Sequence, residues 1–328
     1  MTTLSQLSKD LIGVLLLVLF GYCFFFVDIN TNDLAIPASL LNVNSIFLSI
    51  VLEAIPFILL GVFASALIQV FVSEELIQRL IPKNPYIALL PAVLVSALLP
   101  VCECAIIPVI RRLLKKGLPL HIGVVILVGA PILNPIVFAA TFYAFQSNTS
   151  IVYSRMGLAV VACLLIGLSV YFFFKNSNQL RHVHVHEHEE ANVGNKLKQT
   201  LYHAGDEFFD MGKYLLFGAL VASLFQTFLD RHLLTSLASN DFMSSAVMMG
   251  FAYVLSLCSE ADAFVASSFS HTFSPTALLA FLLYGPMMDF KNTIMLLSFF
   301  KKRFAFSLIF IITVIVYLVV MTYGIVSR

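Results

Sequence analysis

The sequence has little charge and few cysteines, and both shortages narrow the class of protein. Only 11% of its 328 residues are Asp, Glu, Lys or Arg, whereas 60% are hydrophobic. Soluble domains carry about a quarter charged residues and about half apolar residues, so this composition predicts a polytopic membrane protein. Five cysteines in a chain of this length do not indicate a disulfide framework. A net charge of +1 predicts no nucleic-acid partner.

The sequence also lacks the motifs of common pumps and catalysts. It contains no GxxxxGK[ST] phosphate loop, so transport would depend on an ion gradient or on a separate partner that supplies energy. It contains neither an HExxH motif nor a Ser-His-Asp arrangement. We therefore expect a protein that is not an enzyme and that needs no cofactor.

Several apolar stretches are long enough to span a bilayer, which takes about 20 mostly apolar residues. Two other apolar regions, 85–116 and 243–272, are interrupted near their middle, at LLPVCEC and LSLCSEAD. Each of these two regions is either one broken crossing or a hairpin that begins and ends on the same side. The uninterrupted stretches cover approximately residues 10–27, 45–72, 119–146, 151–174, 207–229, 276–299 and 304–325.

The distribution of Lys and Arg distinguishes these topologies, because cytoplasmic loops collect positive charge. If both interrupted regions are re-entrant hairpins, fourteen Lys and Arg residues lie inside and three, including Arg155, lie outside. If both regions span the membrane, the counts become eight and nine, and the bias disappears. We therefore predict seven crossings, two re-entrant elements and a cytoplasmic RRLLKK run at 111–116.

A weak internal repeat agrees with this topology. EAIPFILLGVFASALIQVF (53–71) aligns without gaps on DMGKYLLFGALVASLFQTF (210–228), and the same offset places Glu103 on Glu260. Three crossings in each copy would invert the second copy relative to the first, which is a recurrent transporter architecture. The predicted fold is an all-α polytopic membrane protein with two inverted repeats that contain discontinuous, re-entrant helices.

The chain is expected to have four parts. They are an N-terminal helix with an outer loop at 1–44, a first transmembrane repeat at 45–174, a His-rich cytoplasmic linker at 175–206, and a second repeat at 207–328. The linker contains RHVHVHEHEE, in which alternate His residues would share one side of an extended chain. Such a tract can capture Zn, Ni or Cu, but a solvated linker would have the same pattern. The four His residues are His182, His184, His186 and His188.

The segment SALLPVCECAIIP (96–108) places two thiols and a carboxylate beside a helix break. Pro100 removes a backbone donor, and irregular chain at membrane depth persists only inside protein or beside a water-filled cavity. In an extended tip, Cys102 and Cys104 would face the same way, opposite to Glu103. Thiolates bind soft metals and metalloids such as Zn, Cu(I) or As(III). The alternative is that the cysteines are small packing residues.

The second interruption, LSLCSEADAF (255–264), supplies Cys258, Ser259, Glu260 and Asp262. If the two halves face each other, Glu103 and Glu260 approach, and two close carboxylates cannot both ionise cheaply. One of them would then bind a proton and permit the exchange of a cation for protons. The alternative is that these acids are solvated near the membrane surface.

Two proline-containing breaks supply further candidates. GAPILNP contains Asn134, and YGPMMDFKN contains Asp289, Lys291 and Asn292. Their freed carbonyls and polar side chains would line a path, with Lys291 neutralising Asp289 or Glu260. The alternative is that the breaks are kinks that only shape the packing.

Three positions in the repeated helices are candidates for a role in coupling or in helix packing. Glu53 lies inside an apolar stretch, three residues before Pro56, and is a gate or coupling candidate. Gly61 and Gly218 align in the repeat, and small residues at such positions permit close helix packing.

The stretch PVCECAIIPVIRRLLKKGLPL, followed by GAPILNPIVFAATFYAF, resembles the predicted-permease family that includes the ArsP organoarsenical permeases and the YcgR and YraQ proteins. The resemblance covers about residues 45–325 and is strongest for the YcgR-like branch. It implies a multi-pass permease of the bacterial plasma membrane, often paired with a second, smaller membrane subunit; a homo-oligomer stays open. The motif positions that it singles out are Cys102, Glu103, Cys104, Asn134 and Pro135.

Three hypotheses for the function follow. The first is a gradient-driven permease subunit that exports a thiophilic metal or metalloid ion, with Cys102 and Cys104 contacting the ion and Glu103 with Glu260 exchanging protons for it. The second is a permease that moves protons or a small anion and serves pH homeostasis. The third is a membrane sensor without transport, whose His-rich linker reads metal or pH.

Overall fold

The computed structural model of the chain describes residues 38–71, 73, 75, 82, 84–174, 179–180, 196–228 and 241–327. Within these residues the regular structure is helical, apart from one isolated bridge between Leu180 and Phe300. Five helical spans among them are long and apolar enough to cross a membrane. The predicted all-α architecture with membrane-type helices is therefore confirmed. The N-terminal helix expected at 10–27 lies outside the described residues.

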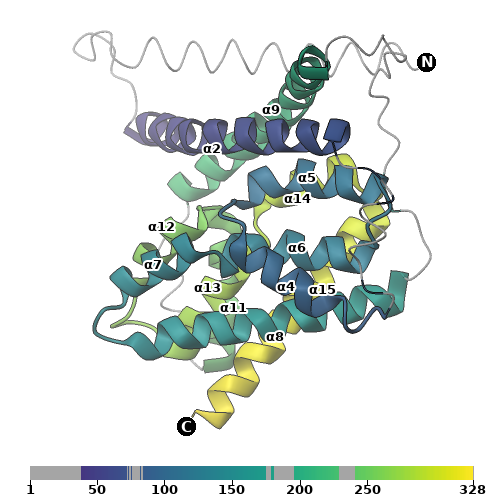
Figure 1. Ribbon diagram of the computed structural model, residues 1–328. Helices are drawn as coiled ribbons and strands as arrows, with labels where there is room; N and C mark the ends of the chain where they lie inside the picture. Colours follow the sequence, from purple (N-terminus) through teal and green to yellow (C-terminus); the bar gives the residue numbers. More distant parts are fainter. Residues whose placement is uncertain are drawn as a thin grey trace, which may run out of the picture.

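The same order of elements occurs twice along the chain: a long helix, two pairs of short helices with a break inside each pair, and another long helix. The first series is α2 (Ala38–Phe71), α4 (Leu89–Leu98), α5 (Glu103–Lys115), α6 (Leu120–Leu133), α7 (Pro135–Ala144) and α8 (Thr149–Phe174). The second is α9 (Lys196–Phe228), α11 (Asp241–Leu255), α12 (Ser259–Ser268), α13 (Pro275–Met287), α14 (Phe290–Phe299) and α15 (Lys302–Val326). Figure 1 shows α2 and α9 crossing on one side of the molecule, α8 on the opposite side, and the broken helices between them.

Both long helices that open these series begin earlier than predicted. α9 starts at Lys196, inside the range expected to be linker, and α2 starts at Ala38 rather than near residue 45. A hydropathy window detects only the apolar part of a helix. Half of the residues in the stretch KLKQTLYHAGDEFF are good helix formers and none is proline, so the helix can continue beyond the part that a bilayer would cover.

Each break occurs at the segment that the sequence indicates. Between α4 and α5 the backbone is extended at Leu99 and at Cys102, on either side of Pro100. Asn134 and Asp289 have extended backbones at the other two breaks and become the N-caps of α7 and α14. The break between α11 and α12 includes Ser256, whose φ of 48° is in the left-handed region. The predicted discontinuity of the helices is therefore confirmed.

The two closing helices of the series, α8 and α15, run antiparallel. At one end of the pair, the rings of Phe174 and Phe304 lie 5.1 Å apart. At the other end, the hydroxyl oxygens of Ser154 and Tyr323 are 2.7 Å apart. We call the end marked by Phe174 and Phe304 the basic end, because Lys302 and Arg303 lie there, and the other the far end.

The α4–α5 pair starts and finishes at the basic end. Tyr171, in the last turn of α8, contacts the rings of Tyr86 before α4 and of His121 after α5, at centroid distances of 5.8 Å and 5.1 Å. Arg111 of α5 places its guanidinium 4.7 Å from the ring centroid of Phe299. The chain therefore travels from the basic end to the break at Pro100 and returns.

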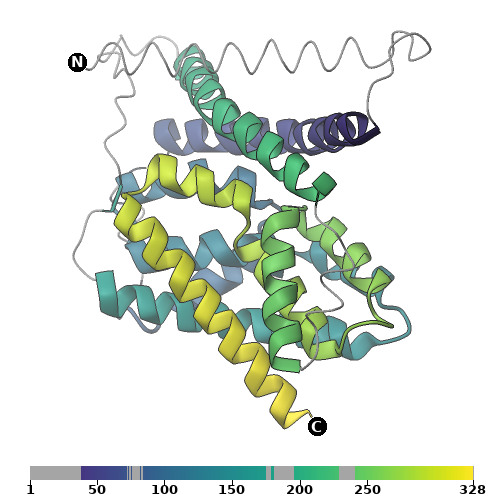
Figure 2. The ribbon, with the colours of Figure 1, turned by 180° about the vertical axis from the view of Figure 1, so that it is seen from behind.

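The α11–α12 pair is arranged in the opposite direction (Figure 2). The Tyr317 hydroxyl, toward the C-terminal end of α15, donates to the carbonyl oxygen of Phe242 at the start of α11. After α12 the chain returns to the same end, since the side chain of Thr276 lies against Gly324. This pair therefore starts and finishes at the far end, with its break in the interior.

Two helices, α6 and α13, form the centre of the molecule. Every residue from His121 to Leu133 in α6 and from Ala277 to Met287 in α13 is buried. Both helices are apolar around their whole circumference, which is the pattern of a helix surrounded by protein. The four breaks lie around these two central helices, close to the middle of the structure.

Candidate site at the helix breaks

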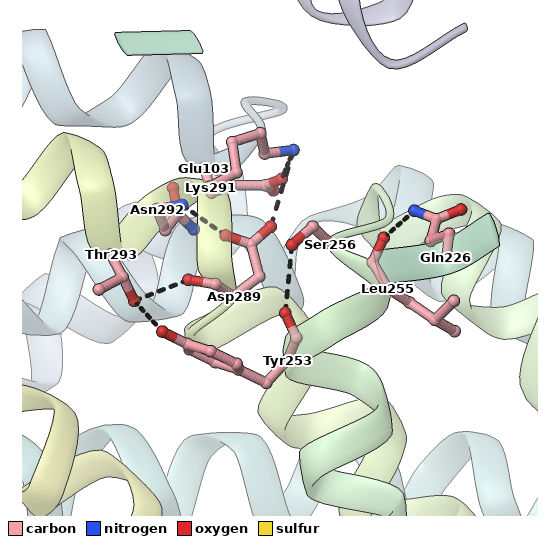
Figure 3. Close-up of polar contacts among 9 residues, drawn as sticks. All are labelled: Glu103, Gln226, Tyr253, Leu255, Ser256, Asp289, Lys291, Asn292 and Thr293. Atoms are coloured by element: carbon pink, nitrogen blue, oxygen red, sulfur yellow. Dashed lines mark hydrogen bonds and ion pairs between the residues drawn. The ribbon is translucent and has the colours of Figure 1, made fainter. Parts of the chain in front are cut away.

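A buried ionic cluster connects the first half of the chain to the second. The Lys291 ammonium at the start of α14 lies 3.0 Å from a Glu103 carboxylate oxygen and 3.7 Å from an Asp289 carboxylate oxygen. Figure 3 shows the Lys291 ammonium connected to both acids by dashed lines. All three residues are at most 2% exposed. Because buried charge is costly in a membrane protein, such a cluster usually marks an ion or proton pathway.

The helix geometry explains why these residues meet. Glu103 is the first residue of α5, and Lys291 lies in the first turn of α14, so two helix N-termini approach each other. The positive end of a helix dipole favours the carboxylate. The sequence predicted Asp289 or Glu260 as the partner of Lys291. In the structure Lys291 lies beside Asp289, and its other partner is Glu103 rather than Glu260.

Asp289 and Asn134 occupy the same position in their respective breaks. The Asn134 side chain accepts a hydrogen bond from the Val137 amide at 2.9 Å and donates to the Ala130 carbonyl oxygen. Asp289 likewise accepts from the Asn292 amide with one oxygen, and its other oxygen faces Lys291. Asn134 therefore uses its side chain to cap α7, whereas Asp289 caps α14 and also contributes charge.

Three thiols surround the ionic cluster. Cys102 and Cys104 are buried, and their side chains are hydrogen-bonded to each other. Cys258, the N-cap of α12, is also buried and lies within electrostatic range of Cys104, Glu103 and Lys291. The extended backbone ends at Cys102, so Glu103 and Cys104 belong to the first turn of a helix rather than to an extended tip.

Two further acids approach the cluster from other helices. Glu260, half-buried in the first turn of α12, lies within electrostatic range of Glu103 and Glu53. Glu53 is exposed on α2. α2 runs parallel to α5, because Gly61 packs on the Ala105 backbone and Ser65 donates to the Pro108 carbonyl oxygen. The part of α2 that contains Glu53 therefore extends past the N-terminus of α5 toward α12.

A second buried group of charges lies toward the far end. Arg155, which the charge count placed among the outside loop residues, is completely buried in α8. Its guanidinium donates to the Thr141 hydroxyl of α7 and, at 3.4 Å, to the Ser259 carbonyl oxygen of α12. Asp262, also buried, interacts electrostatically with Arg155, while its carboxylate lies against Gly285.

Sequence reasoning missed Arg155 as a member of this interior, and it named Cys258 and Asn292 within the breaks without giving them a role. A signal for Arg155 was present, since an arginine seven residues into an apolar helix is expensive unless it has partners. Cys258 had the weaker signal of a thiol inside a break. The environment of Asn292 becomes visible only in three dimensions, where its buried side-chain oxygen has no hydrogen-bond partner among the described residues.

No preformed metal cage exists in the part of the chain that the structure describes, where no group of three His, Cys, Asp or Glu side chains could hold a metal ion. The thiols and carboxylates are near one another but are not arranged as a finished coordination sphere. His182, His184, His186 and His188 lie outside the described residues, so metal capture by the linker stays a prediction.

Comparison with known proteins identifies the family. Residues 39–325 match the model of the ArsP_1 family, described as a predicted permease. The chain belongs to this family. The UPF0718 protein YcgR of Bacillus subtilis is 52% identical over 282 residues, which are 85% of this chain and 96% of that protein. The resemblance expected from the PVCEC and APILNP motifs is confirmed.

A Streptococcus mutans protein named "Putative two-component membrane permease complex subunit" is 39% identical over 274 residues, covering 82% of this chain and 90% of that protein. The UPF0718 protein MJ0584 of Methanocaldococcus jannaschii is 29% identical over 153 residues, covering 45% and 41% of the two chains. No solved structure matches the chain. Family membership and the five apolar spans together identify a multi-pass membrane protein of a transporter family.

Proposed function

We propose that this protein is the ion-conducting subunit of a two-component permease that exports a thiophilic metal or metalloid ion across the bacterial plasma membrane in exchange for protons. The observation that carries the proposal is the buried contact of Glu103 with Lys291 at the point where two broken helices begin. Transporters commonly bind their cargo at the N-termini of discontinuous helices near the middle of the bilayer. The three thiols around this contact are the ligands that soft ions prefer.

The proposed topology has two re-entrant pairs and two inverted repeats. Its main support is that α4–α5 starts and finishes at the basic end, near Tyr171, whereas α11–α12 does so at the far end, near Tyr317. The antiparallel α8 and α15 agree with inversion. The contact of Arg111 with Phe299 also keeps the RRLLKK run beside the Lys301–Arg303 run, as the hairpin topology requires.

Labelling of single introduced cysteines in cells tests this topology. Lys115 and Lys302 are exposed at the basic end, and Ser150 and Thr272 are exposed at the far end. Lys115→Cys and Lys302→Cys should react with a membrane-impermeant reagent only after the cells are opened. Ser150→Cys and Thr272→Cys should react in intact cells. Reaction of Lys115 and Lys302 from opposite sides would overturn the inverted topology.

Coupling to protons would use the acids that converge on the cluster. Glu260 lies within electrostatic range of both Glu103 and Glu53. Arrival of a positive ion would therefore favour release of a proton from this group of three acids. Departure of the ion would favour protonation again. The printed name of the Streptococcus mutans relative supports a second membrane subunit as the partner.

A flux assay tests the function. Purified protein in liposomes, with and without its partner subunit, is exposed in turn to gradients of Zn(II), Cu(I), As(III) and protons. We expect saturable flux of one of the metal or metalloid ions, and loss of that flux in the Cys102→Ser/Cys104→Ser variant. No flux for any member of the panel, with the partner present, would overturn the proposal.

A second candidate is a permease for protons or a small anion that serves pH homeostasis. The observation that favours it is the lack of a preformed three-ligand metal group among the described residues, together with the three acids buried there, Glu103, Asp262 and Asp289. In the same assay this candidate predicts proton flux that survives Cys102→Ser/Cys104→Ser but is lost in Glu103→Gln.

A further inference from the structure

A small cavity lies beside the ionic cluster and is lined by Glu103 of that cluster together with side chains outside it. Glu103 of α5, Met287 and Met288 around the end of α13, and Asn292 of α14 line it together with four aliphatic side chains. The thiols of Cys102 and Cys104 are not part of its lining. The cavity therefore offers thioether and oxygen atoms rather than thiolates.

Two buried oxygen atoms of the lining residues have no hydrogen-bond partner within the part of the chain that the structure describes. One carboxylate oxygen of Glu103 contacts Lys291, while the other, Oε2, is the first of these two atoms. The second is the side-chain oxygen of Asn292, whose backbone amide donates to Asp289. The two residues are 2% and 4% exposed. A buried acceptor without a partner is unfavourable, so two of them beside one cavity indicate a ligand that oxygen atoms can bind, such as a cation.

The local charge balance limits the charge of that cation. Two carboxylates, Glu103 and Asp289, and one ammonium, Lys291, leave one net negative charge in a buried region. A monovalent cation neutralises this charge, whereas a divalent cation would leave a buried positive charge at high cost.

The sulfur atoms of Met287 and Met288 limit the chemical type of the cation that the cavity would bind. Thioethers are soft ligands that select Cu(I) among biological metal ions. The Thr293 hydroxyl lies 3.6 Å from the Met288 sulfur and helps to fix its position, while Met287 has no such contact among the described residues. Soft sulfur, two oxygen acceptors and one negative charge are a combination that suits Cu(I) or its analogue Ag(I).

We infer that this cavity is the cargo site, and that Met287, Met288, Asn292 and Glu103 bind a soft monovalent metal cation there. The inference rests on the proposed permease function and narrows its substrate. It also gives the thiols a different role, on the route to the site rather than in it.

Binding of Ag(I) to the purified full-length protein in lipid nanodiscs tests the inference. Met→Leu changes conserve volume, so Met287→Leu/Met288→Leu should fold normally. Changes to residues that only hydrogen-bond to metal ligands typically cost about 10–100-fold in metal affinity, and removal of direct ligands should weaken Ag(I) binding by at least that factor. Met295→Leu is the matched control, because Met295 is buried in α14 but does not line the cavity. Equal Ag(I) affinity in the double variant and in the control would overturn the inference.

A charge change gives a second, independent readout. Asn292→Asp adds a negative charge to the cavity and should shift the preference from Ag(I) toward Zn(II), as measured by the ratio of the two affinities. Asn292→Leu should weaken both without changing the ratio in favour of Zn(II). An Asn292→Asp protein that folds and keeps the wild-type ratio would contradict the charge argument.

Liposome flux separates failure of this inference from failure of the proposed function. If Met287→Leu/Met288→Leu moves Ag(I) like the wild type while Cys102→Ser/Cys104→Ser does not, the permease function stands and the cavity is not the site. If the wild type moves no member of the metal panel, the proposed permease function itself is wrong, and the inference that rests on it is wrong too.

Discussion

The two buried groups of charge are held in different ways. In the cluster of Glu103, Asp289 and Lys291, opposite charges contact each other directly, across helices from the two halves of the chain. In the group near the far end, Arg155 donates hydrogen bonds to the Thr141 hydroxyl and to the Ser259 carbonyl oxygen. The Asp262 carboxylate has no hydrogen-bond partner among the described residues.

This difference suggests different tasks. A contact between two side chains at the ends of separate helices can open when a cation arrives and close when it leaves. A guanidinium bound to a backbone carbonyl and a hydroxyl instead fixes α7, α8 and α12 relative to one another. Changes in the first cluster should therefore alter transport and stability together, whereas changes at Arg155 should act through the positions of the helices.

The largest effect is expected for Lys291→Met, which would leave two buried carboxylates without a counter-ion. Removal of one partner of a buried pair costs about 3–5 kcal/mol of unfolding free energy. Adding Glu103→Gln and Asp289→Asn should recover most of this loss, since Asn also caps helices well. Equilibrium unfolding in mixed micelles measures the difference. Wild-type stability of the single variant would show that the three charges are not coupled in the membrane protein.

Arg155→Met should have the next largest effect, because two hydrogen bonds from a charged donor are lost and the buried Asp262 loses its electrostatic interaction with Arg155. Hydrogen bonds to charged groups contribute about 1.5–3 kcal/mol each, so we expect a loss of about 3 kcal/mol. Arg303→Met, at an exposed position of the basic end, is the control and should be neutral. If Asp262→Asn in the Arg155→Met background restores no stability, the electrostatic link between the two residues is absent.

The aligned glycines Gly61 and Gly218 should respond unequally to alanine. A Cβ on Gly61 would lie 2.4 Å from the Ala105 carbonyl oxygen, whereas a Cβ on Gly218 would lie 3.4 Å from the Lys291 Cα. Overpacking costs about 1–3 kcal/mol, so Gly61→Ala should lower the unfolding temperature clearly and Gly218→Ala only slightly. Equal shifts would mean that α2 does not pack on α5 as closely as described.

The smallest effect is expected for Asn134→Ala, which removes only the cap of α7. Loss of an N-cap costs about 1 kcal/mol. Ion affinity should be unchanged, in contrast to Asp289→Ala, which removes both a cap and a charge next to Lys291. A large loss of ion affinity in Asn134→Ala would give the first half of the chain a second binding role.

The sequence predicted the breaks well because their causes are local. Pro100 and Pro135, together with the polar residues placed in apolar stretches, specify where helices stop, and the positions agree with the structure. The membrane class could likewise be predicted from composition, and the family from the PVCEC motif, because both can be read directly from the sequence.

The pairing of charges between separate helices could not be predicted, because it depends on how those helices pack. Lys291 meets Glu103 rather than Glu260 since the N-termini of α5 and α14 approach each other. Burial of Arg155 depends on α7 and α12 both reaching α8. The start of α9 at Lys196 escaped prediction because hydropathy does not register a polar helical extension.

The most direct test of the account is the exchange of protons for metal ion at Glu103. Liposomes that contain the protein, its partner subunit and a pH-sensitive dye receive a gradient of the metal ion that the wild type transports best. The account predicts a proton flux opposite to the metal flux in the wild type and in the exposed control Glu75→Gln, and neither flux in Glu103→Gln. Wild-type metal flux in Glu103→Gln would contradict it.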